Sequence, residues 1–252
     1  MIISPSHPRY KSLKTRERLV AGFRKGIVVP QGLIAHGRGE AFDYLIGETS
    51  LKSSKAAAQA AAALLLSAEN PVISVNGNTA ALLPRELVTL ARLVPASLEV
   101  NLFHRTPIRE RRIAWVLKRN GARGVLGVDR TTRTRIRGIA SSRRDVDSKG
   151  IRDADVVLVP LEDGDRAEAL RNDGKKVIAI DLNPMSRTSR AATVTIVDNI
   201  TRAVPELERL VQRMRSFSKS RLEAIIAGFN NDKNLASTIR DMIRFMRGWS
   251  KD

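Results

Sequence analysis

The sequence contains five apolar runs of β-strand composition, and each run ends in polar residues within a position or two. The runs span 72–75, 98–100, 156–160, 177–180 and 194–197, and the polar clusters after them are 76–78, 101, 162–165, 181–184 and 198–199. Because segments of helical composition separate the runs, the pattern predicts one parallel sheet in an α/β fold. Parallel strands share a carboxyl edge, so we expect the polar clusters to meet there, where open α/β sheets bind ligands.

Apolar spacing and helix-forming composition predict helices at 10–25, 40–46, 56–68, 84–93, 108–118, 166–172, 200–214 and over most of 221–249. Ser53 and Ser54 stand where a serine would cap the helix at 56–68. Residues 125–128 have the composition of a further short strand. No repeat or linker interrupts the chain, so we expect a single domain over 1–252 with helical segments at about 1–30 and 200–252.

The composition excludes several kinds of site. Cysteine is absent, so disulfides, thiolate–metal sites and a cysteine nucleophile are ruled out. The three histidines are too scattered to suggest a zinc site, and no apolar stretch is long enough to span a bilayer. The amino terminus has no apolar core of signal-peptide length. We therefore expect a cytoplasmic protein that does not bind membranes.

The net charge of +18 is concentrated in one region, since residues 105–144 contain thirteen Arg or Lys and two acids. Within it, Arg130–Arg144 is predicted to form an exposed basic loop. Nucleic-acid modules usually interleave aromatic residues with basic ones for stacking on bases, and residues 116–144 contain no aromatic residue. We interpret the stretch as solvated surface or as a funnel for small polyanions, and do not expect nucleic acid to be the main ligand.

The residues His36, Gly37, Arg38, Gly39 and Glu40 form a glycine-bounded segment before a predicted helix. Glycine lets the backbone approach an oxyanion, a helix start offers free N–H donors, and the Arg38 guanidinium suits phosphate. Neither the P-loop nor the dinucleotide-binding glycine pattern is present. An ordinary glycine turn explains these residues equally well.

Two strand ends have structural as well as functional explanations. Asn76 and Asn78 flank Gly77, which fits a structural turn or a pair of carboxamides that bind a carboxylate or a hydroxyl. The acids from Glu162 to Asp165 fit Mg²⁺ ligands beside substrate phosphates, or the N-cap of a helix. Neither motif alone identifies a ligand.

The last two strands end in the most specific cluster. Asp181 and Asn183 follow one strand, Ser186–Arg190 supplies hydroxyl and guanidinium groups, and Asp198 and Asn199 follow the next strand before a helix. A carboxylate at a strand tip accepts hydrogen bonds from ribose hydroxyls or an exocyclic amine, and the Ser/Arg/Thr donors suit a phosphate chain. A polar surface loop does not explain why both strands end in Asp and Asn, so we predict a nucleotide cleft.

Seven blocks of the chain, in sequence order, resemble the archaeal phosphopantothenate synthetases, also called 4-phosphopantoate–β-alanine ligases. The blocks are SHPRY, GLIAHGRGEAFDYLIGE, NPVISVNGN, LEVNLF, ADVVLVPLEDGDR, IDLNPMSR and TIVDNI. They extend from about Ser6 to about Arg202. The stretch Arg130–Arg144 and the carboxy-terminal helices resemble the family only loosely.

The resemblance implies a homodimeric enzyme of coenzyme A biosynthesis, with a Rossmann-like parallel sheet flanked by helices. Such an enzyme joins 4-phosphopantoate to β-alanine with ATP and Mg²⁺, and releases AMP and diphosphate by way of an acyl-adenylate. By similarity, the residues that contact ATP are Arg16, Arg38, Asp181, Leu182, Asn183, Arg187, Thr188, Asn199 and Ile200. We expect Arg38 and His36 to act in catalysis, and Asn76, Asn78 and Asn101 to bind phosphopantoate or β-alanine.

Two other functions fit the same sheet edge: a nucleotide-dependent kinase or different amide ligase, and a basic nucleic-acid-binding protein. Release of ADP would identify the kinase, and steeply salt-dependent binding to bulk nucleic acid would identify the second. Near the carboxyl terminus, an apolar stripe at helical spacing fits either a dimer contact or an intrachain core. The stripe consists of Ile239, Met242, Ile243 and Met246.

Overall fold

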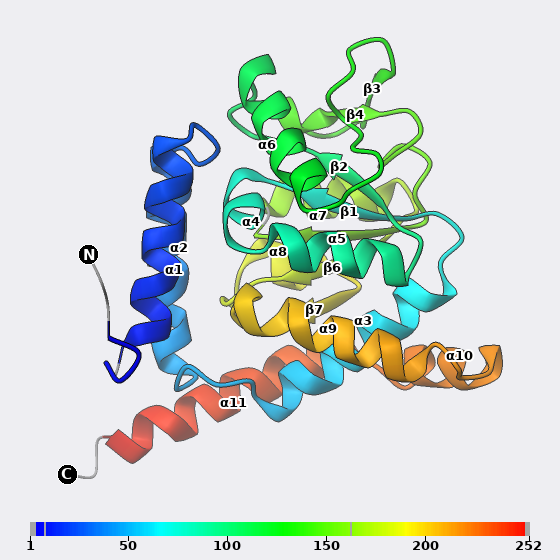
Figure 1. The fold of residues 1–252 in the computed structure, drawn as a ribbon. Coiled ribbons are helices and arrows are strands. Elements are labelled where there is room, and N and C mark those ends of the chain that lie inside the picture. Colours follow the sequence, from blue (N-terminus) through cyan, green and yellow to red (C-terminus); the bar gives the residue numbers. More distant parts are fainter. Residues whose placement is uncertain (1–3, 8, 162, 250–252) are drawn as a thin grey trace.

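The computed structural model describes residues 4–7, 9–161 and 163–249, and a five-stranded parallel sheet lies at its centre (Figure 1). The strand order is β2-β1-β5-β6-β7. The strands are β1 Pro71–Val75, β2 Ser97–Val100, β5 Val156–Pro160, β6 Lys176–Ile180 and β7 Val194–Ile196. All five predicted strands and the α/β class are confirmed. Residues 125–128 contribute only an isolated bridge between Leu126 and Glu99, so the prediction of a further strand there is wrong.

Helices surround the sheet and form both ends of the described chain. They are α1 Tyr10–Arg24, α2 Pro30–Leu45, α3 Lys52–Ser67, α4 Gly77–Leu82, α5 Pro84–Leu93, α6 Pro107–Arg119, the 3-10 turn η1 Ser142–Arg144, α7 Gly164–Asn172, α8 Arg187–Ala191, α9 Ile200–Met214, α10 Lys219–Ala227 and α11 Asn231–Trp249. Among the described helices, none has the length and apolar character needed to cross a bilayer.

Helix α3 begins earlier than predicted, and the prediction that Ser53 or Ser54 caps it is wrong. Both serines are buried inside the helix. The Ser54 hydroxyl donates a hydrogen bond of 2.6 Å to the carbonyl of Val197, and Ser53 accepts one of 2.8 Å from Thr238 on α11. The two serines therefore attach α3 to the end of β7 and to α11.

Alternate side chains of the strands pack on opposite faces of the sheet. On one face, Ile73 and Leu158 belong to the core that includes α3, α5 and α9. On the other face, Val157 packs in a second core with α7 and with Ile136 and Ile139. These two isoleucines come from the Arg-rich stretch, which therefore serves as a layer of the fold.

The prediction that Arg130–Arg144 is an exposed basic loop holds only in part, because Arg130, Arg135, Arg137 and Arg144 are exposed but Ile136, Ile139 and Arg143 are buried. Its strand β3 (Arg133–Arg135) pairs antiparallel with β4 (Asp145–Asp147), beyond the β2 side of the sheet in Figure 1. Its arginines form ion pairs as follows: Arg133 with Glu110 (2.9 Å), Arg135 with Asp145 (3.3 Å) and Arg143 with Asp163 (2.8 Å). Three of the six arginines of this stretch are thus paired with carboxylates, and the isolated isoleucines between the arginines bury apolar surface.

The strand registers bring the strand tips to one edge, as predicted. The paired residues near the strand ends are Val75 with Val100, Pro160 with Ile180, and Ile180 with Ile196. The residues that follow β2, β1, β5, β6 and β7 are Asn101, Asn76, Leu161, Asp181 and Val197. They form one row along the carboxyl edge.

A buried carboxylate holds the segment after β4 against the sheet. Glu99 on β2 is fully buried, and its two oxygens accept hydrogen bonds from the backbone N–H groups of Asp147 (3.1 Å) and Ile151 (2.7 Å). Burial raises the pKa of Glu99 to about 7, opposed by these two donors and by the charge of Arg166 and reinforced by the Asp147 carboxylate. The folded protein therefore holds a proton that the unfolded chain releases at lower pH.

This raised pKa predicts that stability falls as the pH rises from about 4.5 to about 7. In that window the folded state retains the Glu99 proton and the unfolded state does not, so the free energy of unfolding decreases by up to about 1.4 kcal/mol per pH unit. Urea denaturation at pH 5 and pH 7.5 measures the change, and Glu99→Gln should make it smaller. Equal pH slopes for the wild type and Glu99→Gln would show that this carboxylate does not titrate there.

Candidate active site at the carboxyl edge of the sheet

Helix α2 lies across the carboxyl edge and contacts the ends of three strands. Near its start, Asn78 Nδ2, just after β1, donates a hydrogen bond of 2.8 Å to the Gly32 carbonyl. Further along, Gly39 packs on Leu182 after β6, where a Cβ on the glycine would lie 3.6 Å from Leu182 Cδ1. In the last turn of α2, Asp43 accepts a hydrogen bond from the side chain of Asn199, at the start of α9 after β7. Figure 1 shows α1 and α2 side by side along this side of the molecule.

The prediction that residues 36–40 precede a helix is wrong, because they lie inside α2. The helix begins at Pro30, and proline suits the first helical position. A glycine inside a helix costs about 1 kcal/mol relative to alanine, but at Gly32 a Cβ would come within 2.4 Å of Asn78 Oδ1. Arg38 therefore projects from the middle of a helix, and the N–H donors expected from a helix start after it are engaged within α2.

Arg38 and Asp181 form the charged centre of this edge. Asp181 is largely buried after β6, where its carboxylate accepts hydrogen bonds from Ser186 Oγ (2.5 Å) and from the N–H of Asn183 (3.0 Å). Burial raises the pKa of Asp181, while these donors and the charge of Arg38 oppose the rise. Arg38 is exposed, and among the described residues it makes no hydrogen bond or ion pair. Its guanidinium is therefore available to an anionic ligand.

Helix α9 starts at an acid–arginine network that includes Asn199. The side-chain oxygen of Asn199 caps α9. Its Nδ2 donates a hydrogen bond of 2.9 Å to Asp43 Oδ2 on α2. Arg202 Nη2 lies 2.5 Å from Asp43 Oδ1 and 2.6 Å from Asp198 Oδ1. Burial raises the pKa of Asp198, opposed by hydrogen bonds from Ser50 and Arg202. This network fixes the end of α2 to the end of β7.

A cavity of about 370 Å³ lies between α1, α2 and α9, and His36, Glu40 and Asn199 line it. Glu40 Oε2 lies 2.8 Å from Arg16 Nη2, so the charge of Arg16 is already balanced by a carboxylate. Burial lowers the pKa of His36. The imidazole is therefore neutral at pH 7, where it can exchange hydrogen bonds without carrying charge.

The remaining residues predicted to contact ATP lie nearby in differing environments. Arg187 opens α8, and its Nη2 lies 2.8 Å from Glu168 Oε2 on α7. Thr188 is buried in the same helix. The side chains of Leu182 and Ile200 are buried in apolar clusters. Contact of Leu182 or Ile200 with a ligand would therefore use backbone groups.

Asn76 joins the tips of β1 and β5. Its oxygen accepts from the N–H of Thr79 in a capping box at the start of α4, and its Nδ2 donates to the carbonyls of Pro160 (3.0 Å) and Leu161 (3.2 Å). Its side chain is thus engaged in holding the edge together, as is the Nδ2 of Asn78 in its bond to α2. Their contact with substrate stays a prediction.

Asn101 is fully buried at the tip of β2. Its Nδ2 donates to the carbonyls of Arg143 (3.2 Å) and Asp145 (3.1 Å). Its Oδ1 has no hydrogen-bond partner among the described residues. This tip therefore retains one free acceptor.

The structure describes three of the four residues that follow β5 in the predicted acidic cluster at 162–165. Glu162 lies outside the described residues. Asp163 is the N-cap residue of α7, as predicted, although its side chain makes no capping bond, and its Oδ2 lies 2.8 Å from Arg143 Nε. Across the described ranges, no group of three or more His, Asp or Glu side chains is arranged to hold a metal ion.

Sequence reasoning misses three charged residues of this edge. Asp43 lies seven residues after His36, which places both on one face only once α2 is known to be continuous. Arg202 is four residues after Asp198, a spacing that favours an ion pair on a helix. In the sequence, nothing distinguishes Arg109 from the many arginines expected at the surface. The sequence signal that could have identified Arg109 is its place in the first turn of α6, where the helix dipole disfavours a cation.

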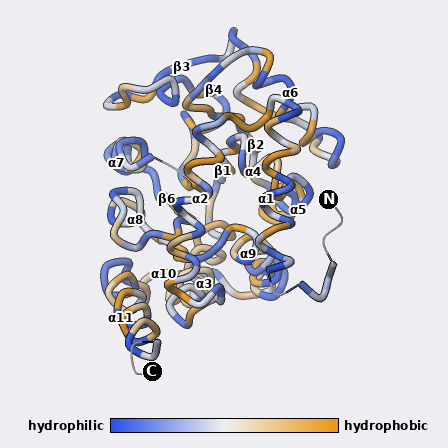
Figure 2. The backbone as a smooth tube through the Cα atoms, turned by 90° about the vertical axis from the view of Figure 1, so that its left-hand side faces the viewer, coloured by the Kyte–Doolittle hydropathy of each residue, from blue (hydrophilic) through white to orange (hydrophobic). Residues whose placement is uncertain are grey.

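The predicted apolar stripe of α11 is divided between core and surface. Met242 is buried with Leu182, whereas Ile243 and Met246 are 40% and 43% exposed. Figure 2 shows both hydrophobic and hydrophilic residues along α11. The stripe therefore makes an intrachain contact and also presents an apolar surface.

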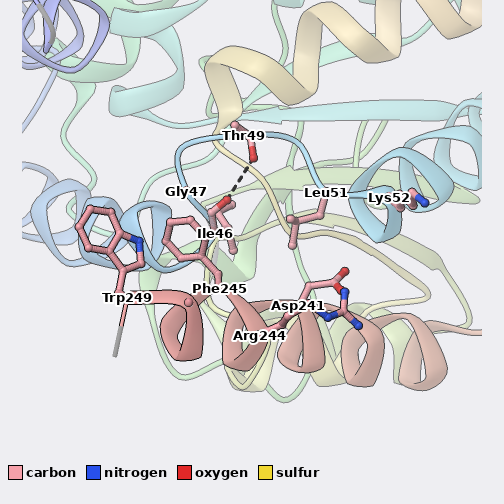
Figure 3. A pocket seen from close by; sticks show the side chains of 10 residues that line it. Ile46, Gly47, Thr49, Leu51, Lys52, Asp241, Arg244, Phe245 and Trp249 are labelled. Carbon is pink, nitrogen blue, oxygen red and sulfur yellow. Dashed lines mark hydrogen bonds and ion pairs between the residues drawn. The ribbon is translucent and has the colours of Figure 1, made fainter. Parts of the chain in front are cut away.

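A groove of about 750 Å³ lies between α11 and the turn after α2 (Figure 3). The rings of Phe245 and Trp249 stand toward one end, and Asp241 pairs with Arg244 at 2.9 Å toward the other. None of the residues predicted to bind ATP or substrate lines this groove. The candidate site is therefore the strand-tip edge under α2.

Comparison with known proteins identifies the family of this chain. Residues 53–245 match the family model described as phosphopantothenate/pantothenate synthetase. A 4-phosphopantoate–β-alanine ligase of Methanosarcina mazei is 52% identical over 95% of this chain and 94% of its own length. Proteins of the same name from Thermococcus onnurineus and Methanospirillum hungatei are 53% and 49% identical, over 92% and 98% of this chain and 89% and 97% of theirs. The chain belongs to the phosphopantothenate/pantothenate synthetase family.

Proposed function

We propose that this chain is a cytoplasmic, ATP-dependent ligase that condenses 4-phosphopantoate with β-alanine in coenzyme A biosynthesis. The observation that carries the proposal is the nearly end-to-end match to relatives named for this reaction. The geometry supports it, because an exposed Arg38 lies in the field of a buried Asp181 at the ligand-binding edge of a parallel sheet.

The proposed reaction has two steps. A carboxylate oxygen of 4-phosphopantoate attacks the α-phosphorus of ATP, which forms an acyl-adenylate and releases diphosphate. The amine of β-alanine then attacks the acyl carbon and loses a proton, and AMP departs as the amide forms. The first step brings two anions together, so it requires positive charge and fixed orientation. Arg38 supplies that charge, and the neutral imidazole of His36 orients the reactants.

The nucleotide lies along the β6 and β7 tips in this proposal. Asp181 and Asn183 bind the ribose or the base, and Arg38 binds the phosphates, with Arg16 and Arg187 at its flanks. The remaining predicted contacts are Thr188, Asn199 and the backbone of Leu182 and Ile200. All of these residues lie on α1, on α2 or just after β6 and β7.

A magnesium ion forms part of the proposal. Mg²⁺ usually keeps several waters and binds through substrate phosphates with one or two carboxylates. In that mode the substrate phosphates supply most of the ligands, and a cluster of three protein carboxylates is not required. The ion would neutralise phosphate charge at the attacked phosphorus.

We also propose a homodimer in which α11 contributes to the contact. Ile243, Met246 and Trp249 expose apolar surface on this helix, and exposed apolar patches are typical of interaction sites. Light scattering should give twice the mass of one chain, and a monomeric mass at micromolar concentration would contradict the proposal.

A coupled assay for nucleotide products tests the function. AMP should form only when ATP, 4-phosphopantoate and β-alanine are present together. Release of ADP would favour a kinase, and AMP formation with a different amine would favour another amide ligase. Nucleic-acid binding is less favoured because several arginines of 130–144 are paired with carboxylates.

A further inference from the structure

Two buried arginines lie at the β2 end of the strand-tip row, away from the proposed nucleotide residues. Arg109 on α6 is 8% exposed and Arg143 on η1 is 6% exposed. Arg109 Nε and Nη1 donate to the carbonyls of Ile27 and His104, both at 2.7 Å. Arg143 pairs with Asp163 and donates to the backbone of the β2 tip. The two guanidiniums are thus held by the scaffold at the same corner.

Arg109 has no balancing negative charge among the described residues. Its hydrogen bonds go to neutral carbonyls, and the neighbouring Glu110 is engaged with Arg105 (2.7 Å) and Arg133 (2.9 Å). Burial, and then the charge of Arg143, lower the pKa of Arg109 to about 10. Its position in the first turn of α6 adds an unfavourable interaction with the helix dipole. A bound anion would relieve all three effects.

Arg109 lies directly against the β1 tip. A Cβ on Gly77 would come within 2.4 Å of Arg109 Nη2 and 2.3 Å of the Ile27 carbonyl, so only glycine lets the guanidinium lie this close. Gly77 stands between Asn76 and Asn78, two residues predicted to bind substrate. The Oδ1 of the buried Asn101 on the adjacent tip also lacks a hydrogen-bond partner among the described residues.

The corner lies within reach of the proposed nucleotide. Strand β1 is separated from β6 by β5, so their tips are about 10 Å apart at the usual strand spacing. Extended 4-phosphopantoate carries a phosphate at one end and a carboxylate at the other. With its phosphate at Arg109, its carboxylate points along the strand-tip row toward Arg38.

We propose that Arg109, supported by Arg143, binds the phosphate monoester of 4-phosphopantoate and makes the enzyme select it over pantoate. The inference rests on the proposed function. Nε and Nη1 of Arg109 are engaged with carbonyls, so Nη2 would donate the charge-assisted hydrogen bond to a phosphate oxygen. When no phosphate is bound, the Arg109 guanidinium bonds only to neutral carbonyls, which penalises a substrate that lacks the phosphate.

The test is steady-state AMP formation with 4-phosphopantoate and with pantoate, for the wild type, Arg109→Gln and Arg109→Lys. Arg111→Gln is the matched control, because Arg111 lies on the same helix and is exposed. Arg109→Gln should raise the KM for 4-phosphopantoate by about 100-fold, the loss of a charge-assisted pair. The KM values for ATP and β-alanine should stay within about threefold. Arg109→Lys should recover part of the loss, and the control should match the wild type.

Each outcome separates the phosphate site from the ligase activity. A wild type that forms no AMP with all three substrates overturns the proposed function. An active wild type that uses pantoate as well as 4-phosphopantoate overturns the phosphate inference alone, whatever the variants do. So does a folded Arg109→Gln protein that keeps the wild-type KM for 4-phosphopantoate and the wild-type discrimination against pantoate. Thermal melting identifies a variant that has failed to fold.

Discussion

Replacing Arg38 by alanine should slow AMP formation by a factor of roughly 100 to 1,000, the usual cost of removing one group that stabilises developing charge. The effect arises because Arg38 is exposed in the field of Asp181 and makes no hydrogen bond or ion pair among the described residues. Stability should change little, since the side chain makes no hydrogen bond or ion pair there. We expect the melting temperature to stay within about 2 °C of the wild type.

The control for this variant is Arg240→Ala, which removes the same charge from an exposed position on α11. It should leave turnover unchanged. Arg38→Lys should recover part of the rate through its charge but not through the guanidinium fork. Near-normal turnover of Arg38→Ala would remove Arg38 from the catalytic residues.

Replacing Asp43 by alanine should lower the free energy of unfolding by about 3 kcal/mol, because it leaves a partly buried arginine without one of its two carboxylates. The Asp43 side chain is 6% exposed and accepts hydrogen bonds from Asn199 and from both terminal nitrogens of Arg202. In this variant Arg202 keeps its ion pair with Asp198, which limits the loss of stability. Urea denaturation measures the change, and turnover should also fall as α2 separates from α9.

The matched control is Asp241→Ala, which breaks an exposed ion pair with Arg244 three residues along α11. Exposed pairs contribute less than about 1 kcal/mol. If the two variants were equally stable, the network at the start of α9 would have no special role in fixing α2.

The sheet can be predicted from the sequence because its strands are short apolar runs between turn-forming residues. Helices α5 and α9 also begin and end where the sequence places them. Pro84 suits the first position of α5, and the apolar residues of α9 recur at helical spacing. Once the strands are parallel, their polar tips must share an edge, so the site's location follows as well.

Helix α2 and the Arg-rich stretch could not be predicted in the same way. Gly32, Gly37 and Gly39 lower the local helix propensity of α2, and contacts with Asn78, Leu182 and Asn199 compensate from distant positions. The layer at 130–144 depends on two isolated isoleucines, which make no periodic pattern. In both segments, tertiary contacts override the local signal.

The uncompensated charge at Arg109 is likewise invisible to composition. A count of arginines does not reveal which of them meets a carboxylate and which meets only carbonyls. That distinction depends on how α6, the β1 tip and η1 come together.

Because α2 contacts the strand ends at its start, middle and end, we expect this edge of the enzyme to work without a hinged flap. The amide hydrogens of the central turns of α2 should then exchange with solvent about as slowly during turnover as at rest. Enzymes that close a mobile loop over ATP must reorder that loop in every cycle, and a pre-built edge avoids this step.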